Sequence, residues 1–346
     1  MSMYLLIFVS CSLIGQNSIS SEDTFADKWE FVGVAVEEHG YTIWGTSPII
    51  GDDGKVHLYI ARWPCALKVD PGWRSHSEIA HYVGDTPEGP FIFSDIALQG
   101  TGSETWDKFG AHNPSVQKAG DKFVLLYVAN DNPNQPPHPA NQKIGMALSD
   151  SPYGPWEKAG NDGLILTTPA NQDCWNYNAG NGVNNPALLE HPGGSYFLYF
   201  KSEKARMGVA IANKIEGPYV QLPFPVTTND KTIEDGYAFI YKGKLSLLTT
   251  DNHGIIKKGG GILWTSGDGI HFNEYEKGFK RIDEYTSVDT SIALTHYGNP
   301  NIFKFERPQI LMQNGKPTYL YLTSGTNIYG GSCTVSYVLK FKDNDH

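Results

Sequence analysis

A two-part pattern that recurs five times along the chain is the feature that most restricts its fold. Each unit opens with a short polar run, usually ending in proline, and then an apolar pair. The openings recur about every 65 residues, and such internal repetition indicates a repeat architecture. A turn and a second apolar segment follow each opening. The openings are Ser47-Pro48-Ile49-Ile50, Asn113-Pro114-Ser115-Val116, Asn185-Pro186-Ala187-Leu188, the proline-free Glu234-Asp235-Gly236-Tyr237, and Arg307-Pro308-Gln309-Ile310.

The second half of each unit repeats as well. An apolar segment is followed by a turn rich in glycine and proline and then by an aromatic residue, as in Gly89-Pro90-Phe91 and Gly154-Pro155-Trp156. Such turns between alternating apolar segments are typical of β-hairpins. Two hairpins per unit, repeated around an axis, predict an all-β, five-bladed β-propeller with four antiparallel strands per blade. A β-sandwich with similar turns is the alternative.

Both ends of the repeat region have the alternating pattern of strands, from Trp29 to Ala35 and from Cys333 to Phe341. We expect one of these segments to complete the blade of the other terminus, because this removes an exposed sheet edge. Residues 21–346 are therefore assigned to a single propeller domain.

Residues 1–20 have features of a signal peptide. The apolar run from Tyr4 to Val9 is followed by small and polar residues and is too short to span a bilayer. We expect export to the periplasm, the outer surface or the medium, with a lipid anchor at Cys11 as a further expectation. A buried N-terminal strand is the alternative. No other segment is apolar enough to cross a membrane.

Three cysteines follow the predicted signal peptide: Cys65, Cys174 and Cys333. An odd number cannot all pair within one chain, and their spacing predicts no particular disulfide. Because no C-x-x-C pair is present, a zinc site built on cysteines is not expected.

The charge balance restricts the class of partner. The formal net charge is −10, so the protein repels phosphate backbones and nucleic acid is not expected to bind. A neutral saccharide fits this balance better than a heavily sulfated one, unless local basic pockets reverse it. The sequence also lacks a P-loop and a G-x-S-x-G nucleophile elbow.

One end of a propeller carries the loops that precede the first strand of each blade and the loops between its second and third strands. The sequence places carboxylates, imidazoles, amides and aromatics there. Carboxylate pairs hydrolyse glycosidic bonds, while Asn, Arg and Trp bind sugar hydroxyls and ring faces. Candidate catalytic residues are Glu78, His112, Glu234, Asp235 and Glu306. Candidate substrate-binding residues are Trp44, Ser47, Arg62, Trp63, Asn113, Asn185, Lys201, Asp251, His253 and Arg307.

Several of these residues also have a structural interpretation, as turn formers, as packing between blades or as internal ion pairs. They are Asn113 and Asn185 before proline, Trp44 and Trp63, Asp251 with His253, and Glu306 with Arg307. Two adjacent acids at the opening of a blade cost electrostatic repulsion, so Glu234 and Asp235 are the strongest candidates for function.

The blade openings, the Gly-Pro-aromatic turns and the Glu-Asp-Gly-Tyr and Glu-Arg-Pro-Gln runs resemble the five-bladed propeller glycoside hydrolases, over roughly Tyr41 to Phe341. These are the arabinanases and β-xylosidases of family 43 and the 3,6-anhydro-L-galactosidases of family 117. The resemblance implies hydrolysis of glycosidic bonds. In the arabinanase type, blade one carries an Asp-Pro base, blade three an Asp that tunes the acid, and blade four a Glu general acid.

This pattern carries over only in part. Glu234 falls at the place of the general acid, two residues before Gly236. Ser47 precedes Pro48 where the base is expected, and Asn185 stands in place of the tuning Asp, so neither position offers a carboxylate. The anhydro-galactosidases can use a histidine as the acid, which adds three candidates: His112, His253 and His296.

The sequence therefore predicts an exo-acting, inverting glycoside hydrolase that acts on an oligosaccharide from a plant or algal polysaccharide. Glu234 or Asp235 would be the acid, with a pKa raised by burial and by the neighbouring charge. Glu78 or Glu306 would be the base, at about 6.5–9.5 Å from the acid. No cofactor is expected to be required, and calcium or magnesium on the axis would be weakly held. The alternatives are a carbohydrate-binding propeller without catalysis and a polysaccharide lyase.

Overall fold

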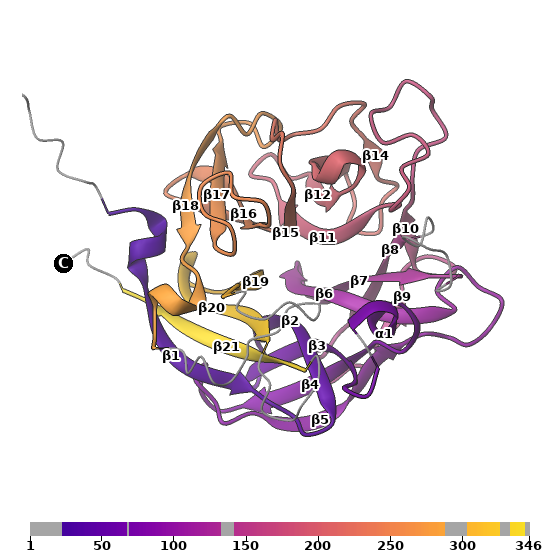
Figure 1. The fold of residues 1–346 in the computed structure, drawn as a ribbon. Helices are drawn as coiled ribbons and strands as arrows, with labels where there is room; N and C mark the ends of the chain where they lie inside the picture. Colours follow the sequence, from indigo (N-terminus) through magenta and orange to yellow (C-terminus); the bar gives the residue numbers. More distant parts are fainter. Residues whose placement is uncertain (1–22, 68, 133–141, 288–302, 326–332, 343–346) are drawn as a thin grey trace, which may run out of the picture.

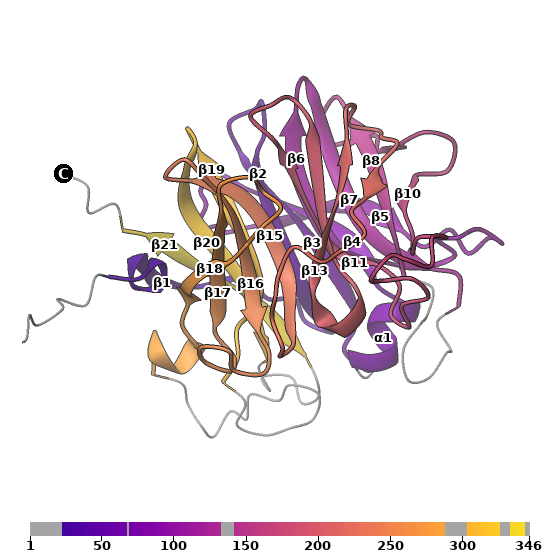
Figure 2. The same ribbon diagram turned by 90° about the horizontal axis from the view of Figure 1, so that it is seen from above.

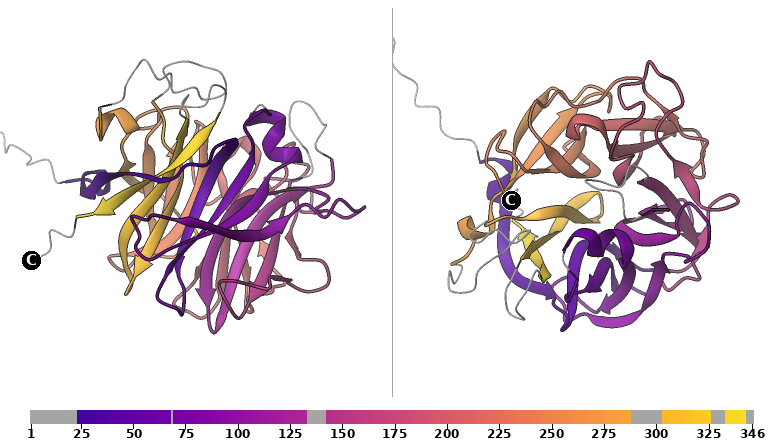
Figure 3. Two further views of the ribbon diagram at one scale, coloured as in Figure 1. Left: turned by 90° about the horizontal axis from the view of Figure 1, so that it is seen from below. Right: turned by 45° about the vertical axis from the view of Figure 1, so that its right-hand side comes forward.

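The computed structural model describes residues 23–67, 69–132, 142–287, 303–325 and 333–342, which form five sheets around one axis (Figures 1 and 3). This confirms the predicted all-β, five-bladed propeller. The first strand of each blade lies nearest the axis, and each blade is an antiparallel meander. The predicted signal peptide with Cys11 lies outside the described residues, as does His296.

The strands are given from the axis outward. Blade one consists of β2 (Tyr41–Ile50), β3 (Val56–Pro64), β4 (Glu78–Gly84) and β5 (Ile92–Gln99). Blade two has β6 (Phe109–Ala119), β7 (Lys122–Asn130) and β8 (Lys143–Ser149), and its outer edge is shared by the short β9 (Glu157–Lys158) and β10 (Leu164–Leu166). Blade three has β11 (Asn184–Glu190), β12 (Tyr196–Lys201), β13 (Met207–Ala212) and β14 (Val220–Gln221).

Blade four consists of β15 (Ile233–Tyr241), β16 (Lys244–Asp251), β17 (Gly261–Ser266) and β18 (Glu274–Phe279). Blade five has β19 (Glu306–Gln313), β20 (Lys316–Gly325), β21 (Thr334–Phe341) and, outermost, β1 (Trp29–Val36). The short helices are η1 (Phe25–Lys28), α1 (Val69–Ser75), η2 (Glu203–Ala205) and η3 (Ile282–Glu284). Helix α1 connects β3 to β4 and lies at the end of the ring where the inner strands begin, which we call the mouth (Figure 2).

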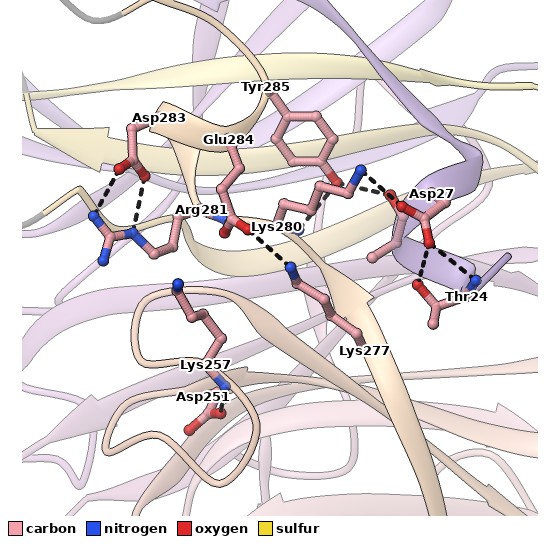
Figure 4. A network of polar contacts seen from close by, with 11 residues as sticks. Thr24, Asp27, Asp251, Lys257, Lys277, Lys280, Arg281, Asp283, Glu284 and Tyr285 are labelled. Atoms are coloured by element: carbon pink, nitrogen blue, oxygen red, sulfur yellow. Dashed lines mark hydrogen bonds and ion pairs between the residues drawn. The ribbon is translucent and has the colours of Figure 1, made fainter. Parts of the chain in front are cut away.

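The N-terminal strand closes the ring, as expected. β1 pairs antiparallel with β21, and Trp29 lies opposite Phe341. The preceding η1 is fastened to the segment that follows blade four: the Asp27 carboxylate lies 2.7 Å from Lys280 Nζ, and the Tyr285 hydroxyl donates to the backbone oxygen of Ala26 at 3.2 Å (Figure 4). The N-terminal segment therefore ties blades four and five together.

The apolar core is divided into five seams, one between each pair of neighbouring blades. The alternating strands present apolar side chains on both faces of each blade, and these meet the facing side chains of the next blade. Leu126 of blade two packs with Leu198 of blade three, for example, and Leu58 of blade one packs with Tyr321 of blade five. A blade therefore buries its two faces only when the ring is complete.

Tight hairpin turns at the end opposite the mouth link the first two strands of each blade. Lys242-Gly243 and Asn314-Gly315 have positive φ at both residues, at +49° and +77° and at +52° and +74°. This is the type I′ turn, whose twist matches that of the flanking strands. These turns hold the ends of the inner strands in fixed positions.

A disulfide joins Cys65, just after β3 of blade one, to Cys333, just before β21 of blade five, and Cys174 is free. The sequence did not indicate this pairing. The bond spans 268 residues and links the first blade to the last across the seam that completes the ring. No helix within the described residues has the length and apolarity that a membrane span needs.

We expect reduction of the Cys65–Cys333 bond to lower thermal stability. Releasing so long a loop restores conformational entropy to the unfolded chain, roughly 3–5 kcal/mol in a chain-entropy treatment. The midpoint temperature of unfolding should fall by roughly 5–10 °C when reductant is present during differential scanning calorimetry. The double variant Cys65→Ser/Cys333→Ser should show the same fall without reductant. Cys174→Ser is the matched control and should still respond to reductant. Identical melting of the oxidised and reduced protein would contradict the expectation.

Candidate active site

The inner strand of every blade begins with the same β-bulge. The register skips two residues at each opening, so that Trp44 and Ser47 of β2, for example, face Ala61 and Tyr59 of β3. The second residue of each bulge has positive φ, and a bulge of this kind redirects a side chain out of the sheet. The five positions are Gly45 (+64°), Asn113 (+50°), Asn185 (+52°), Asp235 (+62°) and Arg307 (+56°).

These bulge residues form a ring around the axis. Asn113 Nδ2 donates to Asn185 Oδ1 at 2.8 Å, and Asn185 Nδ2 donates to Asp235 Oδ1 at 2.9 Å. Arg307 Nη1 lies 3.8 Å from Asp235 Oδ1, and its Nη2 donates to the backbone oxygen of Asn113 at 3.0 Å. The ring is buried, and it links four blades through polar contacts.

Blade one contributes a glycine to the ring, because the Arg307 side chain occupies the space beside it. A Cβ added to Gly45 would lie 3.1 Å from Arg307 Cγ. Matching the blade openings by sequence placed Ser47 at the position that Gly45 occupies, and this match is therefore wrong by two residues. Ser47 instead donates to Gln309 Oε1 at 3.1 Å and accepts from the backbone N–H of Val116 at 2.9 Å, so it connects blades five, one and two.

Three carboxylates meet at the base of the mouth: Asp235 belongs to the ring, and Glu234 and Glu306 lie beside it. Glu234 and Glu306 are the first bulge residues of blades four and five, and one oxygen from each lies within 4.8 Å of the other and of an oxygen of Asp235. Glu234 forms an ion pair with Lys201, and Glu306 with Lys304. The Glu234 side chain is 30% exposed and that of Glu306 only 4%, so Glu234 is the carboxylate that solvent reaches most easily.

The surroundings move the pKa values of these carboxyls in different directions. Burial acts to raise the pKa of Glu234, but the charges of Lys201 and Lys304 outweigh it and lower the pKa to about 2. Burial and the Glu234 charge raise the pKa of Asp235 to about 6, and burial raises the pKa of Glu306. The shift of Glu234 is thus opposite to the one expected from the sequence.

Asp235 is held below the other two acids by neutral donors. The Thr250 hydroxyl donates to its Oδ2 at 3.0 Å and accepts from the backbone N–H of Arg307 at 3.2 Å. With Asn185 on its other oxygen, Asp235 has little freedom to reach a ligand. Its effect on the mouth is electrostatic.

His112 lies in the opposite wall of the mouth, between two tryptophans. Its ring centroid is 5.5 Å from that of Trp63 and 5.1 Å from that of Trp73. Because the Ser77 hydroxyl donates to the backbone oxygen of Ala111, His112 Nδ1 donates to Ser77 at 3.0 Å and Nε2 is left as an acceptor. Burial and the Arg307 charge lower the pKa of His112 to about 3, so it is neutral near pH 7.

Glu78 and Arg62 lie together in a separate cluster. Arg62 Nε donates to Glu78 at 2.9 Å and Nη1 donates to Glu38 at 2.7 Å, while the guanidinium lies 4.4 Å from the Tyr41 ring centroid. No contact among the described residues joins Glu78 to the three mouth carboxylates.

Other predicted site residues are divided between the walls and the loops. Trp44 and Trp63 are buried, at 8% and 1% exposure, and pack with Ala61. The Asp251 carboxylate accepts four backbone N–H groups from residues 254–257, which fixes that loop and leaves it no further role in binding. His253 is exposed on the same loop.

The sequence interpretation missed four residues of the site. Gly45 was hidden by the register error, and Thr250 and Lys304 lie outside the motifs that were aligned. Trp73 is carried by α1, and unlike Trp44 and Trp63 it is only partly buried. Aromatic residues on helical insertions in the loops between second and third strands would have been the signal for it.

The carboxylate cluster resembles a metal site in its spacing but not in its charge balance. Three oxygens within 4.8 Å of one another match the spacing of cation ligands. Each acid, however, already has a cation beside it, from Lys201, Lys304 and Arg307. The cluster is electroneutral without a metal, so these residues do not favour one.

We expect Arg307→Met to destabilise the protein by roughly 3–5 kcal/mol, because it leaves Asp235 buried without its counter-charge. Urea unfolding at pH 7 measures the effect. Arg206→Met is the matched control, since Arg206 is half-buried and, among the described residues, donates to a backbone oxygen, that of Asn229. Equal losses in the two variants would contradict a specific role of the ring.

Asp235 should make stability depend on pH between about 4 and 6. Its pKa is about 6 in the folded protein and about 3.9 in an unfolded chain, so its contribution is fully present below about pH 4 and is lost as the pH rises through about 6. Relative to Asp235→Asn, the wild-type protein should therefore lose stability over this range. A difference in melting temperature that does not change with pH would contradict this.

The comparisons with known proteins concern the fold. The chain matches no protein-family model and no curated protein sequence. Its structure is similar to that of a family 117 glycoside hydrolase from the marine bacterium Zobellia galactanivorans, with a TM-score of 0.64 and 16% identity over 92% of this chain and 91% of that one.

Two family 43 structures are also similar. A β-xylosidase/α-arabinofuranosidase from a compost metagenome, in complex with xylotriose, has a TM-score of 0.59 and 16% identity over 90% of this chain and 94% of that one. An enzyme from Xanthomonas citri has a TM-score of 0.57 and 12% identity over 91% and 92%. At these identities the comparisons establish a common fold, which this chain shares with glycoside hydrolases of families 117 and 43.

Proposed function

We propose that the protein is a glycoside hydrolase whose mouth binds an oligosaccharide derived from a plant or algal polysaccharide. The observation that carries the proposal is the group of three carboxylates with divergent pKa values at the mouth of a propeller. Groups whose surroundings move their pKa values apart are the usual acid and base of a hydrolytic site. The shared fold and the saccharide bound by the family 43 neighbour support the substrate class.

The assignment of roles follows from these pKa directions. Glu234 is ionised and partly exposed, which suits a base or nucleophile, whereas Glu306 is buried with a raised pKa, which suits the proton donor. Asp235 would act as a tuning group, because it lies next to both glutamates and its charge changes near pH 6. These roles reverse the order expected from the sequence.

The spacing of the two glutamates bears on the stereochemical outcome. Their nearest oxygens lie within 4.8 Å, closer than the roughly 6.5–9.5 Å typical of inverting pairs and nearer to the roughly 5–5.5 Å of retaining ones. NMR of the first-formed anomer of the released sugar distinguishes the two outcomes.

An exo mode of action is supported by the shape of the site. The buried ring of Asn113, Asn185, Asp235 and Arg307 fills the axis below Glu234 and Glu306. A site closed at its base accepts the end of a chain more readily than its middle. Trp73 and His112 would line the wall opposite the acids, where the ring face and the Nε2 acceptor can contact a sugar.

A second candidate function is carbohydrate binding without catalysis. It is favoured by Gly45 and Asn185, which place no carboxylate where the arabinanase type has its base and its tuning Asp. This candidate predicts saccharide binding with no released sugar. A lyase would instead release an unsaturated product that absorbs in the ultraviolet.

We also propose that the protein is exported. The Cys65–Cys333 disulfide supports this, because such bonds persist in oxidising compartments. The lipid anchor at Cys11 remains part of the proposal, and mass spectrometry of the mature N-terminus tests both.

Leaving-group dependence separates the acid from the base. Glu306→Gln should lower turnover of the natural oligosaccharide by roughly 10²–10⁴ while sparing an aryl glycoside with a good leaving group, which needs no proton. Glu234→Ala should lose activity on both substrates, and azide should restore part of it by replacing the missing carboxylate. A panel of plant, red-algal and green-algal oligosaccharides, assayed for released monosaccharide, identifies the substrate.

Glu274→Gln on the outer strand of blade four is the matched control and should keep full turnover, because the side-chain partners of Glu274 within the described residues are Lys244 and Thr265. A loss in Glu78→Gln as large as that in Glu234→Ala would return the role of base to Glu78. Unchanged turnover in both mouth variants would rule out Glu234 and Glu306 as the catalytic pair, whereas binding with no released sugar in the wild type would leave the non-catalytic binding function.

A further inference from the structure

A second concave site lies at the end of the ring opposite the mouth, between blades four and five. It is bordered by the end of β15, the β19–β20 turn, the end of β21 and the start of β1 (Figure 1). Its volume is 680 Å³, within the range of about 300–1,000 Å³ usual for small-ligand sites. Five lysines line it, and we call it the lysine cleft: Lys28, Lys242, Lys316, Lys340 and Lys342.

The charge of the lysine cleft is opposite to that of the protein. None of its 13 lining residues is acidic, although the chain as a whole carries a net charge of −10. Among the described residues, Glu88 lies 3.6 Å from Lys340 Nζ, and Glu274 and Glu276 line a neighbouring cavity that Lys242 also borders. The five lysines outnumber these acids around the cleft, so an anion between them would relieve their mutual repulsion.

Two tight turns form one side of the cleft. Lys242 occupies the first position of a type I′ turn at φ +49°, and Asn314 occupies the same position of the blade-five turn. Asn is favoured at this backbone conformation and Lys is not. The backbone of Lys242 therefore adopts this conformation at some cost in conformational energy, which is typical of residues kept for binding.

Aromatic rings alternate with the lysines. Tyr241, Tyr319 and Phe341 line the cleft and are partly exposed. Lys242 Nζ lies 5.6 Å from the Tyr241 ring centroid, and Lys340 Nζ lies 5.9 Å from that of Tyr319. Ammonium groups beside ring faces bind the two parts of an acidic sugar, its anionic substituent and its apolar ring face.

We propose that the lysine cleft is a second saccharide-binding site, which binds polysaccharide chains bearing carboxylate or sulfate groups. It would hold the protein on an acidic polymer while the mouth remains free. The preference for anions follows from the lysines alone; the choice of a saccharide over another polyanion rests also on the proposed function. The net charge of −10 disfavours nucleic acid, and a concave site suits a chain better than a flat membrane surface.

The test compares binding of polygalacturonate, dextran sulfate and neutral laminarin by affinity electrophoresis and isothermal titration calorimetry. The variant is Lys242→Glu/Lys316→Glu/Lys342→Glu, whose three positions are exposed, so the fold should be kept and calorimetric melting checks it. Wild-type protein should bind at least one of the two polyanions, more weakly as salt is raised, and laminarin poorly. The variant should lose about tenfold or more in affinity.

Lys55→Glu/Lys118→Glu/Lys214→Glu is the matched control, because it changes the net charge equally at exposed positions outside the cleft. It should bind within about threefold of wild type. Binding to only one polyanion identifies the substituent and supports the proposal. Absence of polyanion binding, an equal loss in the control, or stronger binding to phosphatidylglycerol vesicles with the same lysine dependence would overturn it. Turnover is not measured, so failure of the hydrolase proposal does not affect the anion-binding result.

Discussion

Closure of the ring is the constraint on which the rest of the structure depends. Each blade carries apolar side chains on both faces, so an open array would leave two large apolar faces in water. The seam between blades five and one completes the ring, and β1, the Cys65–Cys333 bond and the buried contact between the hydroxyls of Thr46 and Ser336 all reinforce it. The mouth is built from residues of every blade and therefore exists only in the closed ring.

The polar groups at the axis are organised by charge compensation. Three acids and three cations lie within or just above the ring, each acid beside one cation. This pairing lets charged groups remain in a buried setting. The pKa values still differ, because Lys201 and Lys304 both act on Glu234, whereas burial and the Glu234 charge outweigh Arg307 at Asp235. The same contacts thus serve both stability and the proposed chemistry.

The fold was predictable because it depends on local sequence patterns. Each hairpin depends on a few adjacent residues. The repeat showed the five blade openings in order, including the proline-free opening at Glu234. The meeting of Glu234 with Glu306 also followed from their equivalent places in two blades. What the sequence did not show depends on contacts between distant segments: the partner of Cys65, and the Arg307 side chain that makes Gly45 the blade-one member of the ring.

The contact between Gly45 and Arg307 has an evolutionary consequence. A carboxylate at the blade-one position would need a Cβ 3.1 Å from Arg307 Cγ, so it requires Arg307 to move or be replaced. Replacing Arg307 first would in turn leave Asp235 unpaired. Neither single substitution is therefore a neutral intermediate, and the two positions are expected to change together in descent. A change toward the three-acid arrangement of the arabinanase type would therefore have to accommodate two residues that are 262 positions apart in the sequence.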